Sequence, residues 1–217
     1  MMKTINLGII GSGIAARELH WPALEKMKDK FNITMVCNRS EAKARVYADL
    51  ADVRSITDDY HEVLNNPDIE AISVALPFHL NLEVTRAALK AGKDVIVEKP
   101  LAATMAEAAE MCDLAELYSE RVTIVAENLR YRKIVERVCE LIDTDAIGIP
   151  YYILWNYFFF VDPATNKYAA TPWRTGERYP GGFIVDAGVH NIAVIREIFG
   201  EFESCRAQIR GVTPELG

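Results

Sequence analysis

Short apolar runs alternate with longer mixed segments through the first 127 residues of the chain. The runs are rich in β-branched apolar residues, as buried strands of a parallel sheet require. They predict strands at 5–10, 33–37, 53–56, 71–76, 94–98 and 122–126, and helices at 14–28, 41–50, 58–65, 80–91 and 104–118. Thr104 and Glu107 form a capping box at the start of the last helix. This alternation predicts an α/β fold, a doubly wound parallel sheet with helices on both faces.

The pattern changes after residue 127. A helix is predicted at 130–143, followed by a long aromatic strand at 147–161, a polar loop at 163–181, a helix at 183–199 and a strand at 203–212. A long strand that does not return at once to a helix is typical of an α+β arrangement. We therefore divide the chain into residues 1–127 and a partial second domain, residues 128–217.

Composition and charge exclude several classes of protein. The net charge is −7 without a basic cluster, which argues against binding to nucleic acid or an anionic membrane. The longest apolar runs are too short to span a bilayer, and the first residues enter a strand without a signal-peptide pattern. Four cysteines without a CxxC pair predict mostly buried free thiols, a reduced cytoplasm and, with four scattered histidines, no metal site.

Gly11 and Gly13 follow the first strand and precede a helix, with Ala16 completing a GxGxxA pattern. Such a loop brings the backbone close to a pyrophosphate, which sits at the start of the helix. A plain glycine-rich turn is the alternative, since the motif alone is weak. Its place on the first of six strands favours a dinucleotide-binding Rossmann domain. We assign cofactor contacts to Gly11, Ser12, Gly13, Ile14 and Ala15.

The end of the second strand indicates which dinucleotide binds. An acidic residue there would hold the ribose 2′-hydroxyl of NAD. Asn38, Arg39 and Ser40 stand in its place and suit a 2′-phosphate, so NADP is predicted over NAD. In the alternative interpretation Ser40 caps the next helix and Arg39 is solvated. The two interpretations are compatible.

Two further strand ends carry candidate residues. After strand 71–76, Leu76, Pro77 and His79 are assigned to the cofactor, although a loop histidine is the plainer interpretation. After strand 94–98, Glu98 and Lys99 precede Pro100. They are either a solvated pair before a helix or a charged group at the ligand-binding edge of the sheet. A sharp turn of this kind predicts a cis Lys99–Pro100 bond.

Asp186 and His190 lie four residues apart, which places them on one face of the predicted helix 183–199. An ion pair on a solvated helix face is the plain interpretation of this spacing. Gly181 and Gly182, directly before the helix, favour a site instead, because they let another backbone approach closely.

These stretches together resemble the Gfo/Idh/MocA family of NAD(P)-dependent oxidoreductases. The matching residues are the 11–13 loop, 76–102 and 181–192, and the stretch 76–102 is the most specific. The resemblance implies that Lys99, Asp186 and His190 form the catalytic group, and that Trp173 and Arg174 help to hold nicotinamide or substrate. Glu98 and Asn128 are assigned to the cofactor on the same basis. It also implies a second domain with an open, mainly antiparallel sheet, larger than residues 128–217 provide. The chain is thus expected to lack the C-terminal part of such a protein.

The expected activity is reversible hydride transfer between a nicotinamide and a sugar, a cyclitol or a related polyhydroxy compound. Lys99 would polarise the substrate oxygen, His190 would act as general acid and base, and Asp186 would orient His190 or a substrate hydroxyl. Alternatives are a regulatory protein that senses NAD(P) without turnover, and a reductase of the dihydrodiol or biliverdin type. The apolar edges of 147–161 and 203–212 predict a homo-oligomer that forms through the second-domain sheet.

Overall fold

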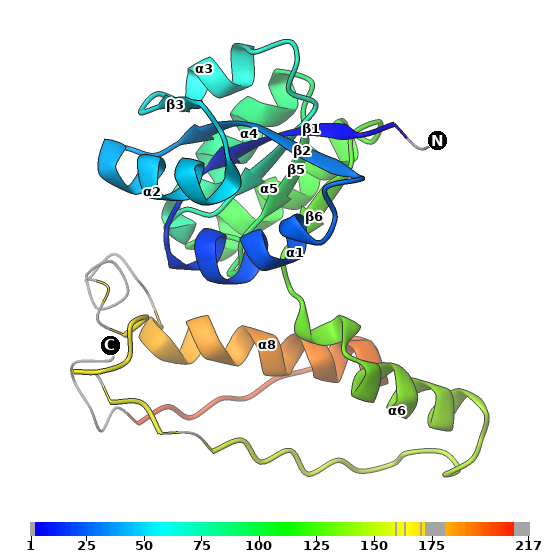
Figure 1. Cartoon of the computed structure of the whole chain (residues 1–217). Helices are drawn as coiled ribbons and strands as arrows, with labels where there is room; N and C mark the ends of the chain where they lie inside the picture. Colours follow the sequence, from blue (N-terminus) through cyan, green and yellow to red (C-terminus); the bar gives the residue numbers. More distant parts are fainter. Residues whose placement is uncertain (1–2, 159, 163, 170, 172–180, 211–217) are drawn as a thin grey trace. The chain divides into compact units, whose positions relative to one another are not determined.

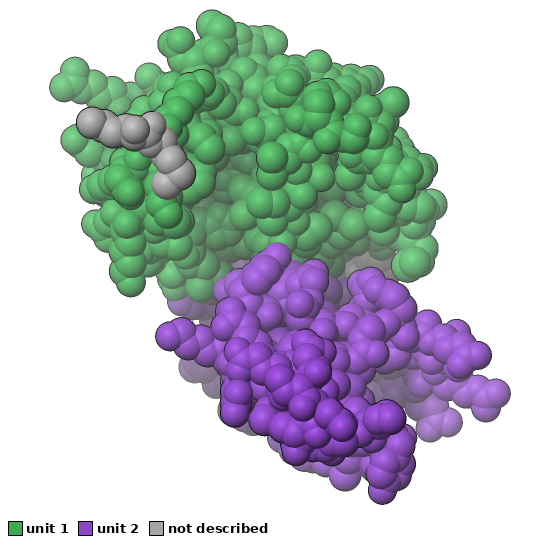
Figure 2. Space-filling model, turned by 90° about the vertical axis from the view of Figure 1, so that its right-hand side faces the viewer, with its two compact units in different colours: residues 1–126 green, residues 127–217 purple. Residues whose placement is uncertain are grey.

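The computed structural model describes residues 3–158, 160–162, 164–169, 171 and 181–210. They form two compact units, Met1–Ala126 and Glu127–Gly217, drawn in green and purple in Figure 2. Each unit is described by itself below.

The first unit is built on one six-stranded sheet (Figure 1). Its strands are β1 (Ile5–Ile10), β2 (Phe31–Cys37), β3 (Ser55–Thr57), β4 (Ala71–Val74), β5 (Asp94–Val97) and β6 (Thr123–Val125). All neighbouring pairs are parallel, and the strand order is β3-β2-β1-β4-β5-β6. The order reverses between β1 and β4, which is the point where doubly wound sheets bind their ligands. The predicted α/β fold with six parallel strands is confirmed.

Helical segments connect the strands. They are η1 (Ala16–His20, a π-helix), α1 (Trp21–Glu25), α2 (Glu41–Ala51), α3 (Tyr60–Asn65), η2 (Phe78–Leu80), α4 (Asn81–Lys90) and α5 (Met105–Leu117). The predicted capping box is present at α5, since the Thr104 hydroxyl accepts from the Glu107 N–H and the Glu107 carboxylate accepts from the Thr104 N–H. The helices cover both faces of the sheet, as the alternation predicted.

Alternate residues of β1 point to different sides of the sheet and enter two separate cores. Leu7 and Ile9 pack with Trp21 of α1 and Tyr47 of α2. Ile10 packs on the opposite face with residues of α3, α4 and α5. A Cβ at Gly8 would lie 2.4 Å from the Val63 side chain, so this position needs glycine for α3 to pack closely. Burial on both faces explains why the strands read as continuous apolar runs.

The cysteine prediction is wrong for most of the thiols. Cys37 is buried at the end of β2, but Cys112 and Cys205 are exposed and Cys139 is half-buried. Cys112 lies on α5, where Met111 and Leu114 are the residues that enter the core. Its apolar neighbours therefore did not indicate which side of the helix is buried.

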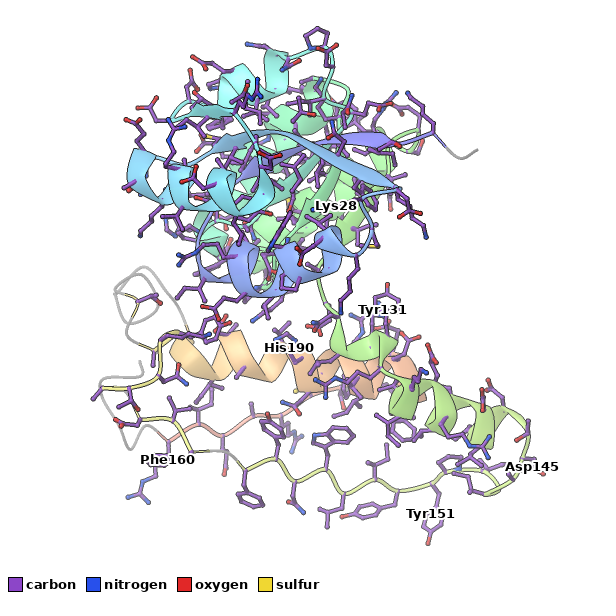
Figure 3. The ribbon with its side chains drawn as sticks, viewed as in Figure 1. Lys28, Tyr131, Asp145, Tyr151, Phe160 and His190 are labelled. Atoms are coloured by element: carbon purple, nitrogen blue, oxygen red, sulfur yellow. The ribbon has the colours of Figure 1, made fainter. Side chains whose placement is uncertain are left out.

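The second unit contains η3 (Leu129–Tyr131), α6 (Lys133–Asp143) and α8 (Gly182–Phe199). The sequence predicted strands at 147–161 and 203–212, but the described residues of both segments pair with no other strand. They run as extended chain in Figure 1. A strand needs a hydrogen-bonded neighbour, and the described part of this unit supplies none to these two segments. Their apolar side chains are accordingly exposed, as Figure 3 shows for Tyr151 and Phe160.

Candidate functional site

The glycine loop lies at the reversal point of the sheet. Gly11 follows β1 with a φ of 94°, a conformation that side chains other than glycine rarely adopt. A Cβ at this position would lie 2.3 Å from the main-chain oxygen of Ala75, the residue that follows β4. Gly11 is therefore required because the chain turns here against the end of the neighbouring strand.

The rest of the loop fits a bound diphosphate. A Cβ at Gly13 would meet no atom within 4 Å, so the space beside this backbone is open. The hydroxyl of Ser12 is buried, and no residue in the described part of the chain hydrogen-bonds to it. The Arg17 N–H donates to the Gly13 carbonyl, so the helical turn starts at the loop itself. Ile14 and Ala15, between the loop and η1, are half-buried. An open glycine face and an unused hydroxyl match what a dinucleotide phosphate needs.

At the end of β2 the structure leaves the predicted 2′-phosphate residues available. Arg39 is exposed and Asn38 is half-buried, with its side-chain amide donating to the Ser40 carbonyl at 3.1 Å. Ser40 is the N-cap residue of α2, but its side chain makes no capping hydrogen bond. The alternative prediction for Ser40 is thus correct in position and wrong about the hydroxyl, which the helix does not use.

The end of β4 lies beside the glycine loop. The Ala75 N–H donates to the Ile10 carbonyl at 2.8 Å, and a Cβ at Gly11 would touch the Leu76 side chain at 3.0 Å. Pro77 is the N-cap residue of η2, and the His79 ring packs edge-on against Phe78. Leu76 is therefore placed next to the expected phosphate site, whereas His79 is engaged with its neighbour.

Glu98, Lys99 and Pro100 follow β5, and the Lys99–Pro100 peptide bond is cis, as predicted. Asn81, the first residue of α4, is completely buried and donates to the carbonyls of Glu98 at 2.9 Å, Pro100 at 3.0 Å and Leu101 at 3.4 Å. Because β1, β4 and β5 are adjacent and parallel, this turn shares the carboxyl edge of the sheet with the glycine loop. Lys99 itself is half-buried.

In the second unit His190 is paired with a carboxylate that the sequence did not indicate. Its ring lies on α8 (Figure 3), and Nδ1 is 2.8 Å from Oε1 and 2.7 Å from Oε2 of Glu127. Glu127 is buried, and its Oε1 also accepts from the Leu129 N–H at 3.1 Å. Asp186 lies one turn before His190 on α8 and is buried, while Asn128 is exposed. His190 is therefore held by Glu127, a carboxylate from outside α8.

Some predicted residues lie outside the described part of the chain. Trp173 and Arg174 are among them. Conversely, the structure brings forward residues that the sequence did not single out: His20, Ser73, Asn81 and Glu127. Their contacts join positions far apart in the chain, and only the place of His20 just after the glycine motif could have drawn attention to it.

The described residues contain neither a metal-binding cluster nor a membrane-spanning helix. No group of three or more His, Cys, Asp or Glu side chains in them is arranged to hold a metal ion. None of the described helices has the length and apolar character needed to cross a membrane.

The amino-acid sequence matches two family models that together cover most of the chain. Residues 5–126 match the model described as oxidoreductase family, NAD-binding Rossmann fold. Residues 135–217 match the GFO/IDH/MocA C-terminal domain.

Individual relatives match over nearly the whole chain. Uncharacterized protein YMR315W of Saccharomyces cerevisiae is 37% identical, over 100% of this chain and 61% of its own length. Levoglucosan dehydrogenase of Pseudarthrobacter phenanthrenivorans is 28% identical, over 99% of this chain and 56% of its own length. The crystal structure of an oxidoreductase from Thermotoga maritima is 38% identical with a TM-score of 0.87, and the match covers 92% of this chain and 61% of that one. The chain thus spans about six tenths of the length of these relatives.

Proposed function

Because the chain belongs to the Gfo/Idh/MocA family of oxidoreductases, we propose that it transfers a hydride between a nicotinamide cofactor and a polyhydroxy substrate. The observation that carries this proposal is the common edge of the sheet in the first unit. The glycine loop after β1 and the Lys99 turn after β5 both lie at this edge, on either side of β4. A phosphate site and a half-buried lysine at one sheet edge are suited to chemistry on a bound dinucleotide.

The proposed cofactor is NADP in preference to NAD. Gly11, Ser12 and Gly13 would hold the diphosphate, and the exposed Arg39 would bind the ribose 2′-phosphate, since no acidic residue ends β2. The unbonded cap hydroxyl of Ser40 supports this assignment. When bound, the nicotinamide supplies the carbon that gives or takes the hydride.

Lys99 is proposed to donate a hydrogen bond to the reacting oxygen of the substrate. Its charge would stabilise the alkoxide that develops as hydride leaves or arrives, which lowers the barrier of the transfer step. The three hydrogen bonds from Asn81 to the surrounding carbonyls hold the main chain from which Lys99 extends. A main chain held in this way favours a fixed direction for the lysine side chain.

His190 is proposed as the general acid and base. Glu127 contacts Nδ1, which sets the orientation of the ring and leaves Nε2 as the nitrogen that exchanges a proton with a substrate hydroxyl. Asp186, one turn earlier on the same helix, is proposed to bind a further hydroxyl. Trp173 and Arg174 remain proposed contacts of the nicotinamide or the substrate.

The substrate class is proposed to be a sugar or cyclitol. Support comes from relatives named levoglucosan dehydrogenase and scyllo-inositol dehydrogenase, the second a structure with NAD(H) and scyllo-inositol bound. We further propose that the extended segments 147–161 and 203–212 are strands of an open, mainly antiparallel sheet. Their exposed apolar side chains, among them Tyr151 and Phe158, support pairing with further strands or with a second subunit.

The test is turnover by the full chain. Change in nicotinamide absorbance is followed with NADP and NAD against a panel of sugars, cyclitols and anhydrosugars, in both reaction directions. Turnover with at least one polyhydroxy compound is expected. Tight cofactor binding without turnover on any of them would overturn the enzyme assignment in favour of a cofactor-sensing regulator.

A further inference from the structure

His20 links three elements of the first unit. It is the last residue of η1, and its ring Nε2 lies 2.6 Å from Oε1 of Glu98, directly after β5. Its Nδ1 lies 3.0 Å from the hydroxyl of Ser73 on β4. The side chains of His20 and Glu98 are each 13% exposed, and Ser73 is buried. With both ring nitrogens engaged, the imidazole is held in one orientation.

The contact continues from Glu98 to Lys99. While Oε1 of Glu98 faces His20, its Oε2 accepts a hydrogen bond from the main-chain N–H of Lys99 at 3.2 Å. The main chain of Glu98 is fixed separately, because its N–H donates to the Val74 carbonyl and its carbonyl accepts from Asn81. The Glu98 carboxylate is therefore not needed to hold its own main chain. It connects His20 with the main-chain N–H of Lys99.

The local helix geometry supports a purpose beyond packing. Residues Ala16–His20 form a π-helical turn, a rare conformation that is frequently found at functional sites. Ala16 and Trp21, at the two ends of this turn, are both buried in the core. The wider turn thus keeps these two apolar residues in the core while His20 reaches the carboxyl edge of the sheet.

Stability alone does not account for a largely buried contact between an imidazole and a carboxylate at this place. Removing polar groups from water costs free energy, and apolar residues of similar size are often as stable or more stable there. A hydrogen-bonded chain from Ser73 through His20 and Glu98 to Lys99 does, however, define a direction for the segment that carries the lysine.

We propose that His20 is a positioning residue of the reaction: it holds the Glu98 carboxylate against the Lys99 N–H, and so aims the lysine side chain. The inference rests on the proposed function, which gives Lys99 its task. It adds a residue that acts only through Glu98 and touches neither cofactor nor substrate.

Two substitutions at one position separate this role from simple packing. In His20→Gln the side-chain amide nitrogen replaces Nε2 and retains a donor toward Glu98. In His20→Asn the amide nitrogen replaces Nδ1, so the contact with Ser73 is retained and the one with Glu98 is lost. His61→Asn on α3 is the matched control, because His61 is exposed.

His20→Asn is expected to lower kcat by about 10²-fold, the effect of a displaced catalytic group, with KM and the Kd for NADP nearly unchanged. His20→Gln should retain most of the kcat, and His61→Asn all of it. Equal losses of kcat in the two His20 variants would contradict the proposal. A large rise in the Kd for NADP would also contradict it, because His20 would then contact the cofactor directly.

A second measurement does not depend on activity. The rate at which acetic anhydride labels Lys99, relative to the exposed Lys43, is measured by peptide mass spectrometry in the protein without cofactor. The ratio should change in His20→Asn and stay at the wild-type value in His20→Gln. An unchanged ratio in both variants would overturn the inference. If the wild-type chain proves to have no turnover, the proposed function fails while this comparison still decides the role of His20.

Discussion

The side-chain amide of Asn81 lies 3.0 Å from the main-chain oxygen of Pro100, so the first residue of α4 holds the turn that carries Lys99. The same amide also donates to the carbonyls of Glu98 and Leu101. One completely buried side chain thus satisfies three main-chain carbonyl groups of the turn that follows β5. The position of the proposed catalytic lysine therefore depends on Asn81, which has no proposed role in the reaction itself.

Replacing Asn81 by leucine, which has a similar shape, should therefore affect both stability and turnover. Loss of the donor leaves buried carbonyls unsatisfied, so the free energy of unfolding should fall by about 1–3 kcal/mol. The kcat should fall as well, because the Lys99 turn is no longer held. Urea unfolding and steady-state kinetics measure the two effects, with Asn65→Leu at the exposed end of α3 as control. Unchanged stability would show that the hydrogen bonds of Asn81 contribute nothing.

Local sequence patterns predicted the elements and the site segments that depend on neighbouring residues. The capping box at Thr104 and Glu107 was correct because both partners lie within one helical turn. The cis bond before Pro100 was correct because a strand end and a proline are visible in the sequence. Short-range patterns of this kind were sufficient to predict most strands of the sheet and the glycine loop.

Contacts between distant positions could not be predicted in this way. His20 and Glu98 are separated by 78 positions, and Glu127 and His190 by 63. No periodicity connects such pairs. The i, i+4 spacing placed Asp186 on one helix face with His190, as a group that orients His190 or a substrate hydroxyl, and gave no sign of Glu127. The strands predicted in the second unit also depend on partners outside their own sequence.

Gly13→Ala should abolish cofactor binding without weakening the fold. A Cβ at Gly13 meets no protein atom in the structure, but it would occupy the open space where the diphosphate is proposed to bind. Gly11→Ala is the matched comparison, and it should also lower the melting temperature. Its Cβ would lie 2.3 Å from the Ala75 oxygen, at a φ that strains alanine by about 1–3 kcal/mol. Calorimetry gives both quantities. Normal NADP binding by Gly13→Ala would contradict the phosphate assignment.

Arg39→Ala should weaken the binding of NADP much more than the binding of NAD. The exposed guanidinium is proposed to bind the 2′-phosphate, which NAD lacks. Titration with each dinucleotide, followed by fluorescence, measures the two Kd values, and Arg54→Ala is a control at another exposed arginine of the same unit. The assignment of this loop is wrong if the wild type binds NAD more tightly than NADP. It is also wrong if the variant loses affinity for NADP and NAD equally.

Cys37 should make stability depend on pH in the alkaline range. Burial, together with the carboxylates of Asp59 and Asp58, raises the pKa of its thiol from 9.0 to about 12. The folded state then binds the thiol proton more tightly than the unfolded chain, so the free energy of unfolding falls as pH rises from 9.0 toward about 12. Burial also raises the pKa of Tyr47 to about 12, but from an ordinary value of 10.0.

The interval between pH 9 and 10 therefore separates the effect of Cys37 from that of Tyr47. Burial also raises the pKa of the Cys139 thiol from 9.0, so only the difference between proteins that all retain Cys139 reports on Cys37. Urea unfolding at both pH values should show that the free energy of unfolding falls less in Cys37→Ala than in the wild type. In Cys112→Ala, at an exposed thiol on α5, the free energy of unfolding should fall by as much as in the wild type. Parallel decreases in all three proteins would show that the Cys37 thiol does not titrate differently in the folded state.

The single-turnover rate of hydride transfer in Lys99→Met tests the central claim most directly. The protein is saturated with cofactor and mixed with the best substrate from the panel, and nicotinamide absorbance is followed through the first turnover. The account predicts a rate about 10²–10³-fold below wild type, because the donor to the developing alkoxide is gone. The Kd for NADP should be unchanged, and Lys90→Met, at the exposed end of α4, should react at the wild-type rate. A Lys99→Met rate equal to that of Lys90→Met would contradict the account.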